Sequence, residues 1–232
     1  LNYIILKLKS PFSKIPNIGS KNYQLEKIDL NNEFIKEVES ILNNPIKYEF
    51  DKIKKKDRRY TYFQNYNFDY FNQVTVQADV KRDYFIKFLD DNFGDKIKKI
   101  YGNHNYRVEH FWLVRTLNKN NKETHNLNSN PHKDTCMPGA LKIIIYLCEV
   151  DENNGPFLAF DKETGSKAIK GSAGASIIFD PRNLLHAGSN TRSAERLAIS
   201  FLMYPTLRKN LEILKEKPFF SDNSVNPFTK YI

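Results

Sequence analysis

The sequence is poor in cysteine and in long apolar runs. Its 232 residues include two cysteines, Cys136 and Cys148, which do not form a C-x-x-C motif. Two cysteines argue against a secreted domain built on disulfides and fit a reducing cytosol. The longest central apolar run, Ile143 to Cys148, is far shorter than the roughly 20 residues of a membrane span. The first apolar residues lack a following small-residue cleavage site, so we expect a first strand there and a cytoplasmic protein.

What the sequence does contain is ample core material and an excess of positive charge. Hydrophobic residues make up 40% of the chain and aromatic residues 13%. The 36 basic residues exceed the 27 acidic ones by nine, which favours encounters with anionic partners without choosing among them. We find no internal repeat and no linker. One soluble domain of ordinary size is therefore expected.

Short strands and a few helices are predicted along this domain. Apolar spacing predicts a helix from Asp29 or Asn31 to about Leu42, and a second helix from Val80 to Phe93 that ends at Gly94. Four strands follow, at Tyr106 to Leu117, Leu141 to Leu147, Ala175 to Phe179 and Leu197 to Tyr204, and then a short helix at Leu207 to Lys215. Strands separated by glycine, proline and asparagine turns favour a mainly β jelly roll with flanking helices.

Two polar segments have more than one interpretation. Residues 52–59 hold six basic side chains, and many aromatic residues follow up to residue 71. Such a combination can bind nucleic acid, but a solvated loop leading into core strands is the interpretation that we favour. Residues 118–130 are almost wholly polar and predict a loop that can close as a lid over a bound substrate.

The residues with chemical potential lie between Pro131 and Pro205. His132 and Asp134 are two positions apart, so on a strand end both point to the same side. His186 follows 54 positions later, just past an apolar strand. Two imidazoles and one carboxylate are the ligands of a mononuclear non-haem Fe(II) that keeps three positions open. Arg196 heads the next apolar strand, where a buried guanidinium needs an anion or an acid beside it.

These residues resemble a known family. His132-Lys133-Asp134, the turn Glu152 to Pro156, and His186-Ala187-Gly188-Ser189-Asn190 with Ser193, Arg196 and Ala198 occur in the order found in Fe(II)/2-oxoglutarate-dependent dioxygenases. Within that superfamily the pattern is most similar to the phytanoyl-CoA dioxygenase-like branch. The resemblance covers about residues 105 to 205.

The resemblance implies a double-stranded β-helix, the jelly roll of these enzymes, and a reaction. Fe(II) would be held by His132, Asp134 and His186, and the 5-carboxylate of 2-oxoglutarate would lie against Arg196. With dioxygen, 2-oxoglutarate would yield succinate and carbon dioxide while an unactivated C–H bond is hydroxylated. Desaturation or ring closure are related outcomes. Halogenases of the family carry a small residue where this chain has Asp134, so hydroxylation is preferred.

The resemblance also suggests a division of the chain. Residues 1–104 would support the core and form the substrate mouth, residues 105–205 would form the jelly roll, and residues 206–232 a terminal helix and tail. Family members often place a small hydroxyl residue two positions after the distal histidine. Here Gly188 occupies that position and Ser189 follows, so Ser189 is a candidate contact of the co-substrate.

Further candidates come from the strands on either side of His132. Arg115 and Trp112 precede the metal-binding segment, and Arg115 is a second candidate for the co-substrate. Lys142 shares a strand face with Ile144 and is either an additional anion contact or an exposed lysine. Cys136 can in principle bind metal, but a buried thiol is the expected role because the three ligands are complete without it.

Two other functions remain open on the sequence alone. One is a cupin-like metal enzyme that does not use 2-oxoglutarate, in which Arg196 is structural. The other is a non-catalytic jelly-roll module that binds an anionic glycan or nucleic acid, although nucleic acid is not the expected partner. For the preferred oxygenase we expect a small-molecule or carrier-bound substrate, and an anionic one suits the net charge. The sequence specifies neither that substrate nor the oligomeric state.

Overall fold

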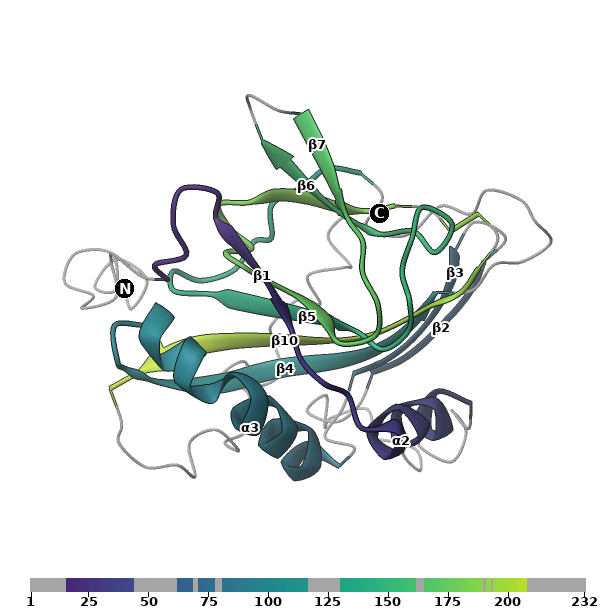
Figure 1. Ribbon diagram of the computed structural model, residues 1–232, viewed down its shortest axis with the longest axis horizontal. Helices are drawn as coiled ribbons and strands as arrows, with labels where there is room; N and C mark the ends of the chain where they lie inside the picture. The colour runs from purple at the N-terminus through teal and green to yellow at the C-terminus, as the bar shows by residue number, and fades with distance from the viewer. Residues whose placement is uncertain are drawn as a thin grey trace, which may run out of the picture.

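The computed structural model describes residues 16–43, 62–68, 71–77, 81–116, 130–161, 165–189, 191–192 and 194–207 (Figure 1). For 62–68 and 71–77 the description covers the backbone. Several predictions fall outside these residues: the strand at the start of the chain, the basic run 52–59, the polar loop 118–130 except its last residue, and nearly all of the helix 207–215.

The described strands form two antiparallel sheets. The larger sheet has the order β1-β8-β5-β10-β4-β3-β2, and the smaller one the order β7-β6-β9. The strands are β1 (Tyr23–Lys27), β2 (Tyr62–Phe68), β3 (Phe71–Gln77), β4 (Asn105–Thr116), β5 (Leu141–Tyr146), β6 (Phe157–Asp161), β7 (Gly165–Ile169), β8 (Ala175–Phe179), β9 (Leu185–Gly188) and β10 (Arg196–Thr206). In the larger sheet, β1, β8, β5, β10 and β4 are neighbours although none of them follows the next directly in sequence, as in a jelly roll. The predicted fold class is confirmed.

Two helices, α2 (Asn32–Asn43) and α3 (Arg82–Ile100), lie on one side of the larger sheet, below β4 and β10 in the view of Figure 1. The Asn31 side chain caps α2, because its Oδ1 accepts a hydrogen bond from the Glu33 backbone N–H at 2.6 Å. Within the described part of the chain, neither helix is long and apolar enough to cross a membrane.

The predicted end of α3 at Phe93 is wrong, because the helix continues through Gly94 for almost two more turns. A Cβ atom at position 94 would lie 2.5 Å from Asp90 Oδ1. That oxygen accepts a hydrogen bond of 2.7 Å from the Tyr106 hydroxyl group of β4. The glycine therefore allows a close approach between helix and sheet and does not terminate the helix.

Apolar side chains fill two layers. One lies between the helices and the larger sheet, and the other lies between the two sheets. Strand β10 serves both: Leu197, Ile199 and Phe201 point to the helices, whereas Ala198 points to the smaller sheet. Because both faces are covered, this central strand reads as a continuous apolar run.

A β-bulge interrupts the alternation of side chains along β4. The register with β10 shifts between Leu202 and Met203, which leaves Glu109 without a partner residue on β10. Val108 and Phe111, on either side of the bulge, both pack into the layer under the helices. Glu109 instead forms a buried ion pair with Arg107. Glu109 therefore lies on the face opposite to Phe111, although strict alternation along a strand would put both residues on one face.

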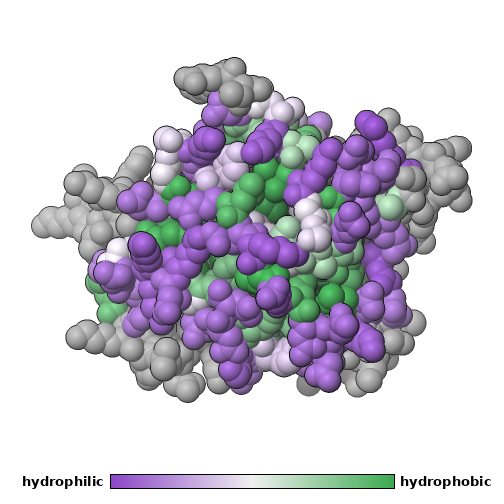
Figure 2. Space-filling view, in the orientation of Figure 1, coloured by the Kyte–Doolittle hydropathy of each residue, from purple (hydrophilic) through white to green (hydrophobic). Residues whose placement is uncertain are grey.

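Polar residues cover most of the face seen in Figure 2, with apolar patches between them. Among the described residues, the large hydrophobic side chains that are exposed are Leu25, Tyr84, Leu185 and Leu207. Most of the large apolar side chains whose burial the structure describes are thus in the interior.

Replacing a residue of the central strand should destabilise the fold. Ile199 is fully buried, so Ile199→Ala should lower the free energy of unfolding by about 2–5 kcal/mol through lost burial and a cavity. Leu25→Ala, at an exposed position of the edge strand β1, should change it by less than about 0.5 kcal/mol. Urea unfolding of both variants tests this. Equal losses would contradict the assignment of β10 to the core.

Candidate metal centre

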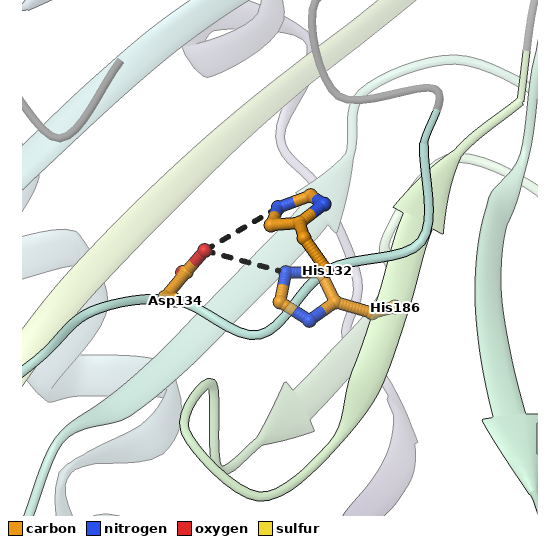
Figure 3. Close-up of side chains that lie close together, drawn as sticks. All are labelled: His132, Asp134 and His186. Atoms are coloured by element: carbon orange, nitrogen blue, oxygen red, sulfur yellow. Dashed lines mark ion pairs between the residues drawn. The ribbon is translucent and has the colours of Figure 1, made fainter. Parts of the chain in front are cut away.

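His132 and His186 are held together by their backbones. His186 lies on β9, and His132 pairs with it as an isolated antiparallel bridge at the edge of the smaller sheet. Each backbone N–H donates to the carbonyl oxygen of the other residue at 2.9 Å. The Asp134 backbone N–H donates to the Pro181 carbonyl oxygen at 2.7 Å. Two distant segments thereby present three side chains to one point (Figure 3).

The three side chains converge through particular atoms. Asp134 Oδ1 lies 3.4 Å from His132 Nε2 and 3.6 Å from His186 Nε2. The two imidazole rings have their centroids 4.5 Å apart. One ligand atom from each residue lies within 4.8 Å of the other two, and no other such group of three occurs among the described residues.

The backbone also selects the tautomer of both histidines. His132 Nδ1 lies 2.8 Å from the carbonyl oxygen of Asn130, and His186 Nδ1 lies 3.0 Å from that of Leu184. A carbonyl oxygen can only accept, so each Nδ1 must carry the hydrogen. Each Nε2 then keeps its lone pair on the side of Asp134, which is the arrangement of metal-binding histidines.

The surroundings give the three groups different charges. Burial lowers the pKa of His186 to about 4, against the opposing effect of Asp134, so this imidazole is neutral at ordinary pH. Burial alone would raise the pKa of Asp134, but Lys142 and His132 outweigh it and hold that pKa below its usual range. The hydrogen bond to Asp134 raises the pKa of His132.

This donor set fits a divalent transition metal. Two imidazole nitrogens and a carboxylate oxygen, all on one side, are the facial set of non-haem Fe(II). Cys136 is not part of the group, and burial raises the pKa of its thiol to about 11, so it is not ionised. The fit concerns His132, Asp134 and His186 alone.

Arg196 is buried at the start of β10, and its guanidinium group donates hydrogen bonds to uncharged acceptors. Its Nη1 donates to the Gly155 carbonyl oxygen, and its Nη2 donates to Thr116 Oγ1 at 3.3 Å. Gly155 has a φ of 72°, a backbone conformation that suits glycine in this Asn-Gly-Pro turn. No carboxylate pairs with Arg196 within the described ranges, so the buried charge can accept an anionic ligand.

The other two candidates for the co-substrate lie in different places. The Ser189 backbone N–H donates to the Pro156 carbonyl oxygen at 2.9 Å, which ties Ser189 to the turn that holds Arg196. Arg115 does not join this group. Its side chain lies on the face of β4 that is turned to the helices, where it contacts Asn43 of α2 and Glu195, the residue before β10. These contacts do not support the prediction that Arg115 binds the co-substrate.

Three residues gain importance from the structure, and one of them, Lys142, was already a candidate on the sequence. Lys142 donates to Asp134 Oδ2 at 3.0 Å. Thr116 lies directly opposite Arg196 in the register of β4 and β10. The Ser200 hydroxyl group is buried on the face of β10 that carries Arg196, and it has no hydrogen-bond partner in the described structure. For Lys142 the strand face was a usable signal; for Thr116 and Ser200 the sequence offers none.

Solved structures with this fold include iron- and 2-oxoglutarate-dependent oxygenases. EctD from S. alaskensis with bound Fe has 13% identity and a TM-score of 0.57, over 88% of this chain and 86% of that chain. A prolyl-4-hydroxylase of Pseudomonas putida has 12% identity and a TM-score of 0.53, over 80% and 93%. The α-ketoglutarate-dependent epimerase SnoN from nogalamycin biosynthesis has 14% identity and a TM-score of 0.58, over 79% and 78%.

At sequence identities of 12–14%, the similarity to these structures shows a shared fold and nothing more specific. No family model matches the chain, and no curated protein matches it in sequence. The fold is therefore that of the 2-oxoglutarate oxygenases.

Metal affinity should depend on pH through His132. Below its raised pKa this histidine is protonated, and a metal ion must displace that proton. Asp134 and His186 are already in their binding forms near neutrality. Co(II) affinity should therefore fall as the pH drops from about 8 to about 6. An affinity that stays constant over this interval, measured by calorimetry, would contradict the assignment.

Proposed function

We propose that this protein is an Fe(II)- and 2-oxoglutarate-dependent oxygenase. The observation that carries the proposal is the convergence of His132, Asp134 and His186 on one point, with both imidazole Nε2 lone pairs directed there. Arg196, a buried cation held by neutral groups alone within the described structure, supports the use of a dicarboxylate co-substrate. Among proteins with this fold, EctD has been solved with 2-oxoglutarate and 5-hydroxyectoine.

Each residue has a defined task. The two histidines and Asp134 hold the metal and leave one side of it open, which is where 2-oxoglutarate and dioxygen would bind. Arg196 receives the 5-carboxylate of 2-oxoglutarate as a planar pair of hydrogen bonds, with Thr116 and Ser189 beside it. The bound Fe(II) supplies the activation of dioxygen. The protein supplies orientation, a fixed charge pattern and exclusion of water.

We propose hydroxylation as the reaction. One oxygen atom of dioxygen enters succinate, formed with carbon dioxide from 2-oxoglutarate, and the other enters the C–H bond of the substrate. Asp134 occupies the position that halogenases leave free, which favours hydroxylation over halogenation. The fold also supports the epimerase SnoN and the carbocyclase SnoK, so the outcome depends on the substrate and its placement.

The remaining parts of the proposal concern the family and the chain. We assign the protein to the phytanoyl-CoA dioxygenase-like branch and treat residues 1–232 as a single domain with its jelly roll at 105–205. Its substrate is a small or carrier-bound molecule, and nucleic acid is not expected. We place the enzyme in the cytoplasm. Measuring succinate formation across a panel of acyl thioesters, amino acids and small metabolites tests this part.

Anaerobic addition of Fe(II) and 2-oxoglutarate should produce a visible metal-to-ligand charge-transfer band, because the co-substrate chelates the metal. His132→Ala should abolish the band, since one of three ligands is lost. His104→Ala, which removes a histidine outside the triad, should retain it. If metal binds and no band forms, the protein is a metal enzyme that does not use 2-oxoglutarate. If no metal binds, a binding module is the better assignment.

Arg196→Met should weaken 2-oxoglutarate binding and leave metal binding intact. Methionine keeps the length of the side chain and removes the charge that the 5-carboxylate needs, so the dissociation constant should rise roughly ten- to hundredfold. Titrating the charge-transfer band with 2-oxoglutarate measures the change. An unchanged dissociation constant would show that Arg196 is structural.

A further inference from the structure

The two oxygens of Asp134 face different partners. Oδ1 is the atom near the two histidine nitrogens, whereas Oδ2 accepts a hydrogen bond of 3.0 Å from Lys142 Nζ. The carboxylate is therefore shared between the metal position and one ammonium group. While Oδ2 stays with Lys142, only Oδ1 is available to a metal, and the remaining positions stay open for other ligands.

Lys142 is itself fixed in place. It extends from β5, and its Nζ lies 5.6 Å from the ring centroid of Trp112 on β4 and 5.9 Å from that of Phe179 on β8. Its side chain is 14% exposed, so water screens its charge weakly. The two aromatic faces favour a cation at this point. The ammonium group of Lys142 is thus held on one side of the Asp134 carboxylate, and the candidate metal position lies on the other side.

We propose that Lys142 is a positioning residue that acts through Asp134 and sets the charge of the centre. This inference rests on the proposed function. Lys142 keeps Asp134 as a one-oxygen ligand and neutralises its negative charge. The loaded centre is then more positive than two histidines and a free carboxylate would make it, so it attracts a dianionic co-substrate more strongly.

The cost of this arrangement is a weaker hold on the metal. The ammonium group repels a divalent cation and competes with it for the carboxylate. Removing the charge of Lys142 should therefore have opposite effects on two affinities: the metal should bind more tightly, and 2-oxoglutarate should bind less tightly. Damage to the fold would weaken both. Opposite signs are thus specific to an electrostatic role.

The test uses Lys142→Met, with Lys142→Arg as the variant that keeps the charge. Lys87→Met is the matched control, because Lys87 also pairs with an aspartate, on the exposed face of α3. Co(II) affinity is measured by calorimetry. Affinity of the Fe(II)-loaded protein for 2-oxoglutarate is measured by anaerobic titration of the charge-transfer band.

For Lys142→Met we expect the Co(II) dissociation constant to fall and that of 2-oxoglutarate to rise, each by about tenfold, a modest effect for one weakly screened charge. Lys142→Arg should retain most of both affinities, and Lys87→Met should leave both unchanged.

Three results would overturn the inference alone. They are a loss of both affinities in Lys142→Met, no change in either, and a weaker 2-oxoglutarate affinity with unchanged metal affinity, which would indicate direct contact with the co-substrate. A wild-type protein that binds no metal, or binds it without 2-oxoglutarate, would instead overturn the proposed function and this inference with it.

Discussion

The reciprocal hydrogen bonding of the His132 and His186 backbones is the constraint on which the site depends. It joins two segments that are 54 positions apart and sets the two imidazole rings side by side. Each ring is then fixed by the carbonyl oxygen two residues before it in the sequence. The backbone thus determines position and tautomer together, and burial in a rigid sheet edge preserves both.

The larger sheet contributes the second half of the site. Its central strand β10 has both faces covered, one by the helices and one by the smaller sheet, so Arg196 at its start is buried. An uncompensated charge there would be costly, and the hydrogen bonds that Arg196 donates to the Gly155 carbonyl oxygen and to Thr116 Oγ1 offset part of that cost. The same core that stabilises the fold therefore holds a buried positive charge next to the smaller sheet.

Charge links the two halves. Asp134 is the acidic member of the triad, and Lys142 already neutralises it. Lys142 and Arg196 both face the space between the sheets, which places two positive charges there. This local pattern is more specific than the overall excess of basic residues, which reflects the whole surface and does not select a ligand.

The sequence by itself indicated the fold class, the strands β4, β5, β8 and β10 and the helix α2, and it singled out His132, Asp134 and His186, which the structure brings together. These follow from local signals: apolar runs, the cap at Asn31, a His-x-Asp pair on one side of a strand, and a histidine at recognisable spacing. Strands β1, β6, β7 and β9 were not predicted, since they are four or five residues long and, apart from β6, mostly not apolar. The length of α3 was also missed. The space beside Gly94 is used by the hydrogen bond between Asp90, one turn earlier in the same helix, and Tyr106 of β4, and this contact exists only in the packed structure.

Only the tertiary structure decided the partners of each functional residue. Strand register set Thr116 opposite Arg196, and the bulge put Glu109 on the face opposite to Phe111. Arg115 lies on the side of β4 that faces the helices, and Lys142 lies on the side of β5 that faces Asp134. A sequence specifies which groups are present and which strand face they share; it cannot specify which distant strand comes to lie alongside, because that is set by how the two sheets pack over the whole core.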